Sequence, residues 1–595
     1  MEVFAALREV LAKFGLDSRQ VGVTGNGACL CGGGRSVVVK HIGCHGFCEM
    51  GPLVRIDPEG LLYCKVKPAD AEEIVEQTVA EGRVVERLLY RHPVTGERYA
   101  RQDEIPFYAK QTRLTLKDCG HIDPHRIDDY LAEGGYRGLA RALLELTPDE
   151  VISEVTASGL RGRGGGGFPT GRKWQLTRQS PAERKFVVCN GDEGDPGAFM
   201  DRSVMEGDPH RVIEGMAIAG YAIGASEGYI YVRAEYPLAV KRLREAIDDA
   251  EEYGLLGDNI LGSGFSFRLY LKEGAGAFVC GEESALLASI EGKRGMPMPK
   301  PPYPAQEGLW RLPTLINNVE TYASVPVILA GGAEAYRRYG TESSPGTKTF
   351  ALTGDVANTG LIEVPMGMPL REILFDIGGG IRSGKRFKAV QIGGPSGGCL
   401  TEEHLDLPLD FDSLSEAGAM IGSGGLVVMD ENTCMVEVAR FFMSFTQNES
   451  CGKCVLCREG TYRMLEILER IVEGKGELRD LDLLEELAET VKDGSLCGLG
   501  KTAPNPVLTT LRYFRDEYIA HVVEKRCPAG ACRALVRYRI NPELCRGCGL
   551  CARSCPVQAI TGRRREPYVI DQDRCIRCGA CINACRLEAI EEVAQ

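Results

Sequence analysis

Near its C-terminus the sequence contains the same spacing of cysteines twice, and this repeat restricts the possible fold more than any other feature. Each run reads C-x2-C-x2-C-x3-C. In iron–sulfur proteins such a loop presents three thiolates to one [4Fe–4S] cluster, while the fourth cysteine binds the other cluster. The repeat therefore predicts two clusters, one bound by Cys545, Cys548, Cys551 and Cys585 and the other by Cys575, Cys578, Cys581 and Cys555.

Zinc ribbons and disulfides are the alternatives for cysteines at this density. Zinc ribbons usually space two well-separated pairs, and disulfides need an oxidising compartment. The repeat, with Pro556 directly after the first run, matches the iron–sulfur spacing more closely. We therefore interpret the chain as one that transfers electrons.

Length and composition limit the remaining possibilities. A chain of 595 residues predicts several domains, because single cores rarely grow beyond about 250–300 residues. The net charge of −13 argues against nucleic-acid binding. No apolar run approaches the roughly 18–20 residues that cross a bilayer, and charges interrupt the N-terminal segment as in an amphipathic helix rather than a signal peptide. We expect no membrane contact and a reducing cytoplasm, where the 24 cysteines are metal ligands rather than disulfide partners.

Five segments differ in their sequence patterns. Segment 91–340 is glycine-rich with alternating strand-like and helix-like runs, which predicts an α/β layer fold. Segment 341–430 has short strand-like runs joined by Gly and Pro turns. Segment 431–526 has the apolar spacing of helices. The segments are 1–90, which carries an early cysteine cluster, 91–340, 341–430, 431–526 and 527–595, which carries the cysteine repeat.

A glycine-rich loop, Gly159 to Phe168, precedes Lys173 and Trp174. Such a run can bring backbone N–H groups against a phosphate, with arginine or lysine balancing the charge. It is neither the G-x-x-x-x-G-K-[ST] nucleotide loop nor a dinucleotide fingerprint after a clear strand. By itself it is equally compatible with a flexible surface loop. Two further segments, CNGDEGDPGAFMDR (189–202) and GAGAFVCGEESALLASIEGKRG (274–295), favour phosphate binding.

Together with KPPYPAQEGLW (300–310) and LINNVET (315–321), these segments resemble the NADH-binding flavoprotein subunit of respiratory complex I. They resemble more closely the β subunits of multimeric cytoplasmic hydrogenases and formate dehydrogenases that are NAD-linked and often electron-bifurcating. The resemblance covers essentially the whole chain. It implies a multidomain α/β fold, in chain order a truncated thioredoxin-like [2Fe–2S] domain (1–90), a Rossmann-like FMN- and NAD-binding domain (91–340), a β-grasp-like SLBB module (341–430), a helical bundle with a [4Fe–4S] cluster (431–526) and a bacterial-type ferredoxin domain with two [4Fe–4S] clusters (527–595).

The resemblance also implies that FMN lies against the glycine loop and that the nicotinamide of NAD(H) stacks on the flavin. The phosphate and ring edge would be held by Gly162, Arg163, Gly164, Gly165 and Lys173. The ring or ribityl chain would be hydrogen-bonded by Asn190, Asp192 and Asn318. The polar groups of the dinucleotide would lie near Glu282, Glu283 and Lys300. For each of these residues a turn or packing role is the alternative.

Asp195 occupies the acidic position of the family's D-E-x-E-P-G pattern. An acid there suits a ribose 2′-hydroxyl and repels a 2′-phosphate, so we expect NAD in preference to NADP. Hydride passes from the nicotinamide to the flavin without a side-chain acid or base, because the cofactor carries the reactivity. No catalytic side chain is therefore expected.

A third cysteine set lies in the helical segment. Cys451, Cys454 and Cys457 form C-x2-C-x2-C, and Cys497 follows across predicted helices. The set resembles the family's [4Fe–4S] cluster beside the flavin, which is the first acceptor of its electrons. A zinc site is the alternative.

His521, Cys527 and Cys532 form H-x5-C-x4-C. Mixed His and Cys ligands at short spacing suit a closed structural zinc site. The fourth ligand must come from elsewhere, and Cys434 is the candidate because it begins the helical segment and has no other assigned task. A set of ordinary buried thiols is the alternative.

The N-terminal region departs from the family pattern. Related β subunits begin with an early C-x4-C and a later C-x3-C; here Cys44 and Cys48 form the later pair, whereas Thr24 stands where the first cysteine belongs. Cys31 would replace the missing ligand. The expected [2Fe–2S] ligands are then Cys29, Cys31, Cys44 and Cys48, and the alternative is a relic domain without a cluster.

The resemblance implies a hetero-oligomer. This chain would couple NAD(H), ferredoxin and a catalytic hydrogenase or formate dehydrogenase subunit, with a small [2Fe–2S] subunit alongside, and the C-terminal tail suggests contact with ferredoxin. Bifurcation is implied by likeness to the bifurcating β subunits and by no single residue. The alternatives are a non-bifurcating NADH diaphorase subunit and, from another class, a zinc-rich structural or nucleic-acid-binding module.

Overall fold

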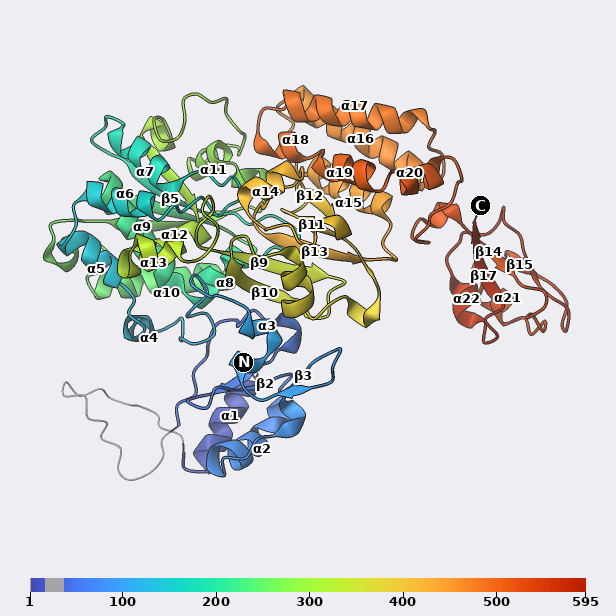
Figure 1. The fold of residues 1–595 in the computed structure, drawn as a ribbon, viewed down its shortest axis with the longest axis horizontal. Coiled ribbons are helices and arrows are strands. Elements are labelled where there is room, and N and C mark those ends of the chain that lie inside the picture. The colour runs from blue at the N-terminus through green and yellow to red at the C-terminus, as the bar shows by residue number, and fades with distance from the viewer. Residues whose placement is uncertain (1, 17–36, 595) are drawn as a thin grey trace. The chain divides into compact units, whose positions relative to one another are not determined.

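A computed structural model describes residues 2–16 and 37–594 of the chain (Figure 1). Cys29 and Cys31, two of the predicted N-terminal cluster ligands, lie outside the described residues. The chain forms two compact units, the first Met1–Lys385 with Glu403–Val428 and the second Arg386–Glu402 with Met429–Gln595. Among the described helices, none combines the length and the apolar character that crossing a membrane requires.

The N-terminal part of the first unit has a small core of its own. Leu7 and Leu11, four residues apart and hence on one face of the first helix, are buried with Tyr63, Ile74 and Val75. The elements of this part are α1 (Glu2–Lys13), β1 (Val54–Ile56), β2 (Leu61–Tyr63), α2 (Ala71–Glu73), a π-helix (Ile74–Ala80), β3 (Tyr90–Arg91), β4 (Arg98–Tyr99), α3 (Pro106–Ala109) and α4 (Ile127–Ala132).

A four-stranded parallel sheet forms the centre of the first unit. Its strands are β5 (Phe186–Gly191), β6 (Glu227–Arg233), β7 (Arg268–Gly274) and β8 (Thr314–Asn318). Their order across the sheet is β7-β6-β5-β8, with every neighbouring pair parallel. The chain thus builds outward from β5 in one direction and then returns to place β8 on its other side. The strand order reverses between β5 and β8.

Helices cover this sheet, as parallel sheets require. Nearly every residue of α9 is buried, and a Cβ at Gly215 would lie 2.1 Å from the Tyr322 carbonyl oxygen of α12, so this glycine permits the close approach of the two helices. The helices are α5 (Arg137–Leu144), α6 (Pro148–Ala157), α7 (Thr170–Gln179), α8 (Met200–Gly207), α9 (Pro209–Ile223), α10 (Pro237–Glu252), α11 (Glu283–Ile290), α12 (Val319–Gly331) and α13 (Ala333–Arg337).

The segment after this layer divides between the two units. In the first unit, β9 (Thr347–Gly354) pairs antiparallel with β10 (Gly360–Pro365) and parallel with the start of β13 (Gly425–Asp430), and α14 (Phe411–Glu416) precedes β13. In the second unit, β11 (Phe387–Ile392) and β12 (Gly398–Thr401) form an antiparallel pair. The predicted module 341–430 therefore contributes strands to both compact units.

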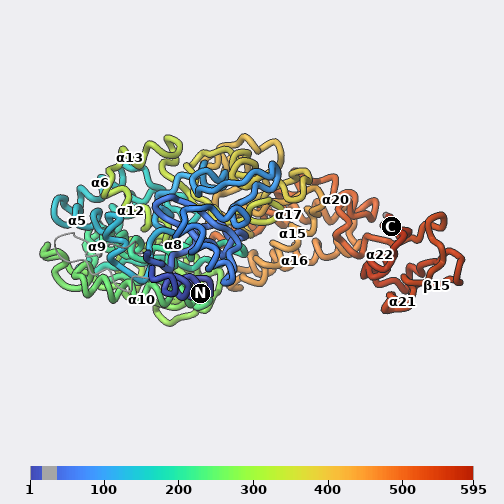
Figure 2. Tube along the Cα trace, turned by 90° about the horizontal axis from the view of Figure 1, so that it is seen from below, coloured from blue at the N-terminus to red at the C-terminus, as the bar shows by residue number. Residues whose placement is uncertain are grey.

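The second unit continues as a helical bundle in which α15 and α16 lie side by side (Figure 2). Apolar residues at helical spacing, among them Met464, Leu468 and Ile471, form its core. The helices are α15 (Met435–Asn448), α16 (Val455–Val472), α17 (Arg479–Gly494), α18 (Gly498–Thr502), α19 (Asn505–Tyr513) and α20 (Arg515–Val522).

The last part of the second unit has two similar halves. Its elements are β14 (Val536–Ile540), α21 (Leu550–Ser554), β15 (Ile560–Thr561), β16 (Val569–Ile570), α22 (Ala580–Ala584) and β17 (Ile590–Ala594). β14 pairs antiparallel with β17, and β15 pairs antiparallel with β16. Each cysteine run thus occupies a loop followed by one short helix, and α21 and α22 pack against each other.

Candidate functional site

The carboxyl edge of the parallel sheet collects most of the predicted flavin residues. Asn190 lies near the end of β5, and Asn318 ends β8. These are the two strands between which the strand order reverses, and ligands of open α/β sheets bind at such a point. The glycine loop lies here too, because a Cβ at Gly164 would come within 2.9 Å of the Asn318 Cβ.

The glycine loop offers hydrogen-bond donors that the described protein does not use. Among the described residues, the backbone N–H groups from Gly164 through Gly167 find no acceptor. Gly165 has φ +116°, and a Cβ there would lie 2.9 Å from the Gly422 carbonyl carbon, so a larger residue would not fit. The loop leads directly into α7, and the N-terminus of a helix favours an anion. Unused donors before a helix N-terminus suit a phosphate.

Two lysines and two glutamates from separate segments meet beside this loop. Lys173, in the first turn of α7, places Nζ 2.6 Å from Glu283, and Lys300 Nζ lies 3.0 Å from Glu282 and 3.1 Å from Glu283. Burial opposes ionisation of Glu283, but the two lysines outweigh it and hold its pKa below the ordinary value. The group is therefore a charged cluster at the sheet edge.

The loop after β5 is tied to the segment before α11. Asn190 Nδ2 donates to the Gly281 carbonyl at 2.9 Å, and Asn190 Oδ1 accepts from the Asp192 N–H at 3.1 Å. Asp195 accepts a hydrogen bond from the Ser423 hydroxyl. Burial raises the pKa of Asp195 to about 6, against the opposing effects of Ser423 and the nearby Arg233.

In the C-terminal module, the structure brings the cysteines together in the crossed sets that the spacing predicts. One enclosed space, the first cluster site, is lined by Cys545, Cys548, Cys551 and Cys585. Another, the second cluster site, is lined by Cys555, Cys575, Cys578 and Cys581. The last cysteine of each run therefore lies with the first three cysteines of the other run.

The cysteines of the helical bundle also converge. Cys454 precedes α16, Cys457 lies in its first turn, and Cys497 precedes α18. Burial raises the pKa of Cys457 to about 11, and Cys454, Cys497 and Cys451 add to the increase through their negative charges. The four cysteines are therefore close enough to affect one another electrostatically, although most of α16 and all of α17 separate Cys457 from Cys497 in sequence.

Comparisons with known proteins agree with this arrangement. Residues 155–327 match the Nuo51 FMN-binding domain, 349–400 the SLBB domain, 437–521 the NADH-ubiquinone oxidoreductase-F iron-sulfur binding region, and 537–586 the 4Fe-4S dicluster domain. The NADP-reducing hydrogenase subunit HndC of Solidesulfovibrio fructosivorans is 59% identical over 77% of this chain and 93% of its own length. The chain belongs to the family of NADH-binding FMN and iron–sulfur subunits shared by hydrogenases and complex I.

Two further members of this flavoprotein family illustrate its range. An NADH-quinone oxidoreductase subunit from Rhizobium meliloti is 48% identical over 70% of this chain and 99% of its own length. The crystal structure of an NAD+-reducing [NiFe]-hydrogenase in the H2-reduced state matches with a TM-score of 0.62 at 31% identity, covering 87% of this chain and 81% of the hydrogenase chain. The expected multidomain α/β fold, with an FMN domain, an SLBB module, a [4Fe–4S] region and a ferredoxin-like end, is confirmed.

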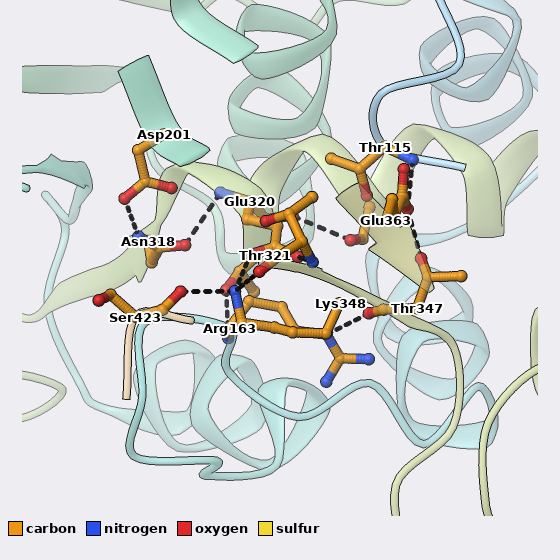
Figure 3. A network of polar contacts seen from close by, with 12 residues as sticks. Thr115, Arg163, Asp201, Asn318, Glu320, Thr321, Thr347, Lys348, Glu363 and Ser423 are labelled. Atoms are coloured by element: carbon orange, nitrogen blue, oxygen red, sulfur yellow. Dashed lines mark hydrogen bonds and ion pairs between the residues drawn. The ribbon is translucent and has the colours of Figure 1, made fainter. Parts of the chain in front are cut away.

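One predicted role in this flavoprotein needs correction. The resemblance placed Arg163 at the flavin phosphate, but its side chain is buried and hydrogen-bonds to protein groups, one of them the Arg161 carbonyl at 3.0 Å (Figure 3). The guanidinium donates to the carbonyls of Thr347 at 2.9 Å and Pro345 at 2.6 Å, and to the Tyr336 hydroxyl at 3.2 Å. Arg163 therefore ties the glycine loop to the segment that contains Pro345 and Thr347. A glycine-rich motif does not reveal the direction in which its arginine points.

Sequence reasoning missed a buried ion pair beneath the same loop. Lys348 and Glu320 are in contact with side chains 0% and 1% exposed, and Lys348 Nζ also donates to the carbonyls of Thr349 at 3.0 Å and Ser423 at 2.7 Å (Figure 3). The Glu320 N–H donates to Asn318 Oδ1 at 2.9 Å. Glu320 belongs to the LINNVET motif, but nothing in the sequence marks Lys348 as its partner.

Asp201 extends this polar network to the other side of Asn318. Asn318 Nδ2 donates to the Asp201 carboxylate at 2.5 Å (Figure 3). Burial, together with the charges of Glu193 and Glu320, raises the pKa of Asp201 well above its usual value. Asn318 is therefore held on both sides by buried acidic residues, which fixes the orientation of its amide at the sheet edge.

The predicted His and Cys group of the second unit comes together as one buried cluster. Its members are Cys434, His521, Cys527 and Cys532, and their ligand atoms all lie within 4.8 Å of one another. Cys434 Sγ lies 3.7 Å from Cys532 Sγ and 3.4 Å from His521 Nε2. Sulfurs of a tetrahedral zinc site, with Zn–S bonds of about 2.3 Å, are separated by about 3.8 Å. His521 Nδ1 lies 2.7 Å from the Glu517 carbonyl, which leaves Nε2 for the cluster.

Only the later pair of N-terminal cysteines can be placed. The Gly46 N–H lies 3.3 Å from Cys44 Sγ, and Cys48 Sγ lies 3.5 Å from the Gly46 carbonyl. A hydrogen bond from Cys48 lowers the pKa of Cys44 to about 6. Both cysteines line a cavity of about 640 Å³ that also contacts α1. Both thiols therefore lie beside Gly46 and face the same cavity.

Proposed function

We propose that this flavoprotein subunit exchanges hydride with NAD(H) at FMN and passes electrons one at a time through its own iron–sulfur clusters. The observation that carries the proposal is the meeting of the glycine loop, Asn318 and the Lys173–Glu283–Lys300 cluster at the switch point of the sheet. Cysteine groups for three [4Fe–4S] clusters lie in the second unit. FMN, when bound, takes up a hydride and returns single electrons.

Each residue group has a separate task in this proposal. The N–H donors of Gly164 and Gly165 would receive the flavin phosphate, with Gly162 closing the loop by donating to the Phe168 carbonyl at 2.8 Å. Lys173 would balance the charge. Asn190, Asp192 and Asn318 would contact the ring or ribityl chain, and Glu282, Glu283 and Lys300 would orient the dinucleotide. The fit rests on unused donors and a paired charge cluster, both present without the cofactor.

NAD(H) rather than NADP(H) is the proposed substrate. Asp195 lies at the family's acidic position, where an ionised carboxylate would repel a 2′-phosphate. The name of the relative in Solidesulfovibrio fructosivorans, an NADP-reducing hydrogenase subunit, makes this point worth testing. Steady-state kinetics of the purified holoenzyme with both nucleotides will decide, and a lower KM for NADPH would overturn the assignment.

Two further metal centres are proposed. Cys434, His521, Cys527 and Cys532 would bind structural zinc, because their buried donor set and spacing suit a closed tetrahedral site. Cys29, Cys31, Cys44 and Cys48 would bind a [2Fe–2S] cluster. A Cys31→Ala variant should lose the [2Fe–2S] EPR signal, and a variant that keeps it would refute this ligand set.

The partners proposed are ferredoxin, a catalytic hydrogenase or formate dehydrogenase subunit and a small [2Fe–2S] subunit, in a cytoplasmic hetero-oligomer. Three redox partners would allow bifurcation, in which two electrons from one donor leave along branches of unequal potential. The alternative is a non-bifurcating diaphorase subunit. Anaerobic assays with NADH, ferredoxin and the third substrate distinguish the two, since bifurcation requires all three together, whereas a diaphorase turns over with NADH and a single acceptor.

A further inference from the structure

The two cluster sites of the C-terminal module differ in their position relative to the incoming chain. Arg577, which lines the second cluster site, donates to the Ala534 carbonyl at 2.6 Å, and Tyr538, the middle residue of β14, lines the same site. Ile540, the last residue of β14, lines the first cluster site. Cys532 of the His and Cys cluster lies only two residues before Ala534. The second site is therefore next to the linker, and the first site is the distal one.

The module also differs from the rest of the chain in charge. Between residues 536 and 594 the sequence has ten arginines, no lysine and seven acidic residues, whereas the whole chain carries −13. Five exposed arginines lie on the loop between Cys545 and Cys548, on the turn that contacts this loop, or directly after Cys585. We call them the distal basic surface, which consists of Arg546, Arg563, Arg564, Arg565 and Arg586.

Backbone contacts place this surface beside the first cluster site. The Arg565 N–H donates to the Gly547 carbonyl at 3.1 Å, and a Cβ at Gly547 would lie 2.4 Å from the Glu566 carbonyl oxygen. The arginine-rich turn therefore lies directly on the loop between Cys545 and Cys548. Arg546 lines the site, and Arg586 follows its ligand Cys585.

The arginines of the two sites are used differently. Within the described part of the chain, none of the five guanidiniums of the distal basic surface has a hydrogen-bond or ion-pair partner. At the second site, by contrast, Arg574 donates to the Val557 carbonyl at 3.4 Å and Arg577 to Ala534. Cys548 and Cys578 are both exposed, so charge and not exposure distinguishes the sites.

We propose that the distal basic surface docks a small acidic protein that carries a surface-near one-electron centre, such as an acidic ferredoxin. This inference rests on the proposed function, because it needs an electron at the first cluster site. One electron would leave the reduced cluster there and enter the oxidised centre of the carrier, with no bond made or broken. Unpaired cations around an electron exit steer an anionic partner and speed its association. The exposed Leu587, which lines the first site, gives the surface an apolar contact.

The test reverses the charge of the turn in the full hetero-oligomer. The variant Arg563→Glu, Arg564→Glu, Arg565→Glu should raise the KM for an acidic two-cluster bacterial ferredoxin at least ~10-fold at low ionic strength, with kcat unchanged, because steering contributes about 10–1,000-fold to association. The difference should shrink in ~0.5 M salt, where the screening length falls to a few ångströms. Fluorescence anisotropy of labelled ferredoxin should show the same loss of affinity without turnover.

A matched control reverses three exposed cations elsewhere in the same unit. The variant Arg386→Glu, Lys475→Glu, Arg479→Glu changes the net charge equally and should leave the ferredoxin KM within twofold. Equal effects of both triples would reduce the result to net charge and overturn the docking surface. Unchanged kinetics in the first triple, with loss of binding to phosphatidylglycerol vesicles, would assign the surface to a membrane instead. A wild-type complex that never reduces ferredoxin would refute the proposed function, which is a separate outcome.

Discussion

Replacing Lys348 by methionine tests whether the buried ion pair supports the flavin site. The substitution removes the cation from a pair whose side chains are 0% and 1% exposed, and keeps the length of the side chain. It also takes a donor from the carbonyls of Thr349 and Ser423. Glu320 is left as a buried carboxylate whose remaining donor in the network is the Thr349 N–H, at 2.8 Å.

The expected loss of stability follows from that burial. Removing one member of a buried pair costs about 3–5 kcal/mol, because the remaining charge keeps its desolvation penalty. Glu320 lies in the first turn of α12, and its N–H donates to Asn318, so the loss of stability should appear first at the flavin site. Neutralising the survivor in Lys348→Met, Glu320→Gln should recover at least half of the loss, since an amide tolerates burial better than an unpaired carboxylate.

Denaturant titration of the holoenzyme, followed by the fluorescence of released FMN, measures this loss. The midpoint shift multiplied by the slope gives the free energy of the transition that releases flavin. Arg268→Met is the matched control, because its pair with Asp258 is largely exposed and such pairs contribute about 0–1 kcal/mol. A Lys348→Met midpoint no lower than that of Arg268→Met would refute the reasoning, as would a double variant less stable than Lys348→Met.

Three further predictions concern nucleotide choice, zinc and electron exit. Because the pKa of Asp195 is raised to about 6, its carboxylate is ionised above that pH, and discrimination against NADPH should weaken as the pH falls through 6. The variant Asp195→Asn should lower the ratio of the KM for NADPH to the KM for NADH at least ~10-fold at pH 8, and this ratio should no longer depend on pH. Metal analysis should find about one zinc and about 14 iron atoms per chain. The variant Cys434→Ala should lose the zinc and keep the iron. A zinc content well below one per chain in the wild type would contradict the site. Cys451→Ser should abolish NADH-driven reduction of the C-terminal clusters, measured by EPR, while NADH reduction of ferricyanide persists; intact cluster reduction would contradict the assigned first acceptor.

Where ligand chemistry imposes spacing, the structure brings together the cysteines that the sequence grouped, and the metals that they bind stay a prediction. The crossed cysteine sets follow from a repeat whose loops can present only three thiolates each, and the structure lines each space with the fourth cysteine of the partner run. Cys434 was identified by elimination, and it lies 3.4 Å from His521 although 87 residues separate them. Metal geometry restricts the possible partners so strongly that few cysteines remain to choose from.

The same reasoning failed where packing decides the outcome. The family resemblance implies that Arg163 holds the flavin phosphate, but the carbonyls of Pro345 and Thr347 accept hydrogen bonds from its guanidinium. Lys348 carries no motif, and its partner Glu320 comes from a different element. Side-chain direction and long-range ion pairs depend on which segments the fold brings together, and local sequence does not contain that information.

We expect the C-terminal module to depend on its proposed clusters for stability as well as for electron transfer. Its core consists of eight buried residues, and two of them, Cys551 and Cys581, are proposed cluster ligands. A module of this size has little apolar surface to bury, so metal ligation supplies a large share of its stability. Because Cys555 and Cys585 cross between the halves, loss of either cluster removes a constraint from both. The distal basic surface lies on one of these loops, and it is therefore well formed only in a module that is also able to carry electrons.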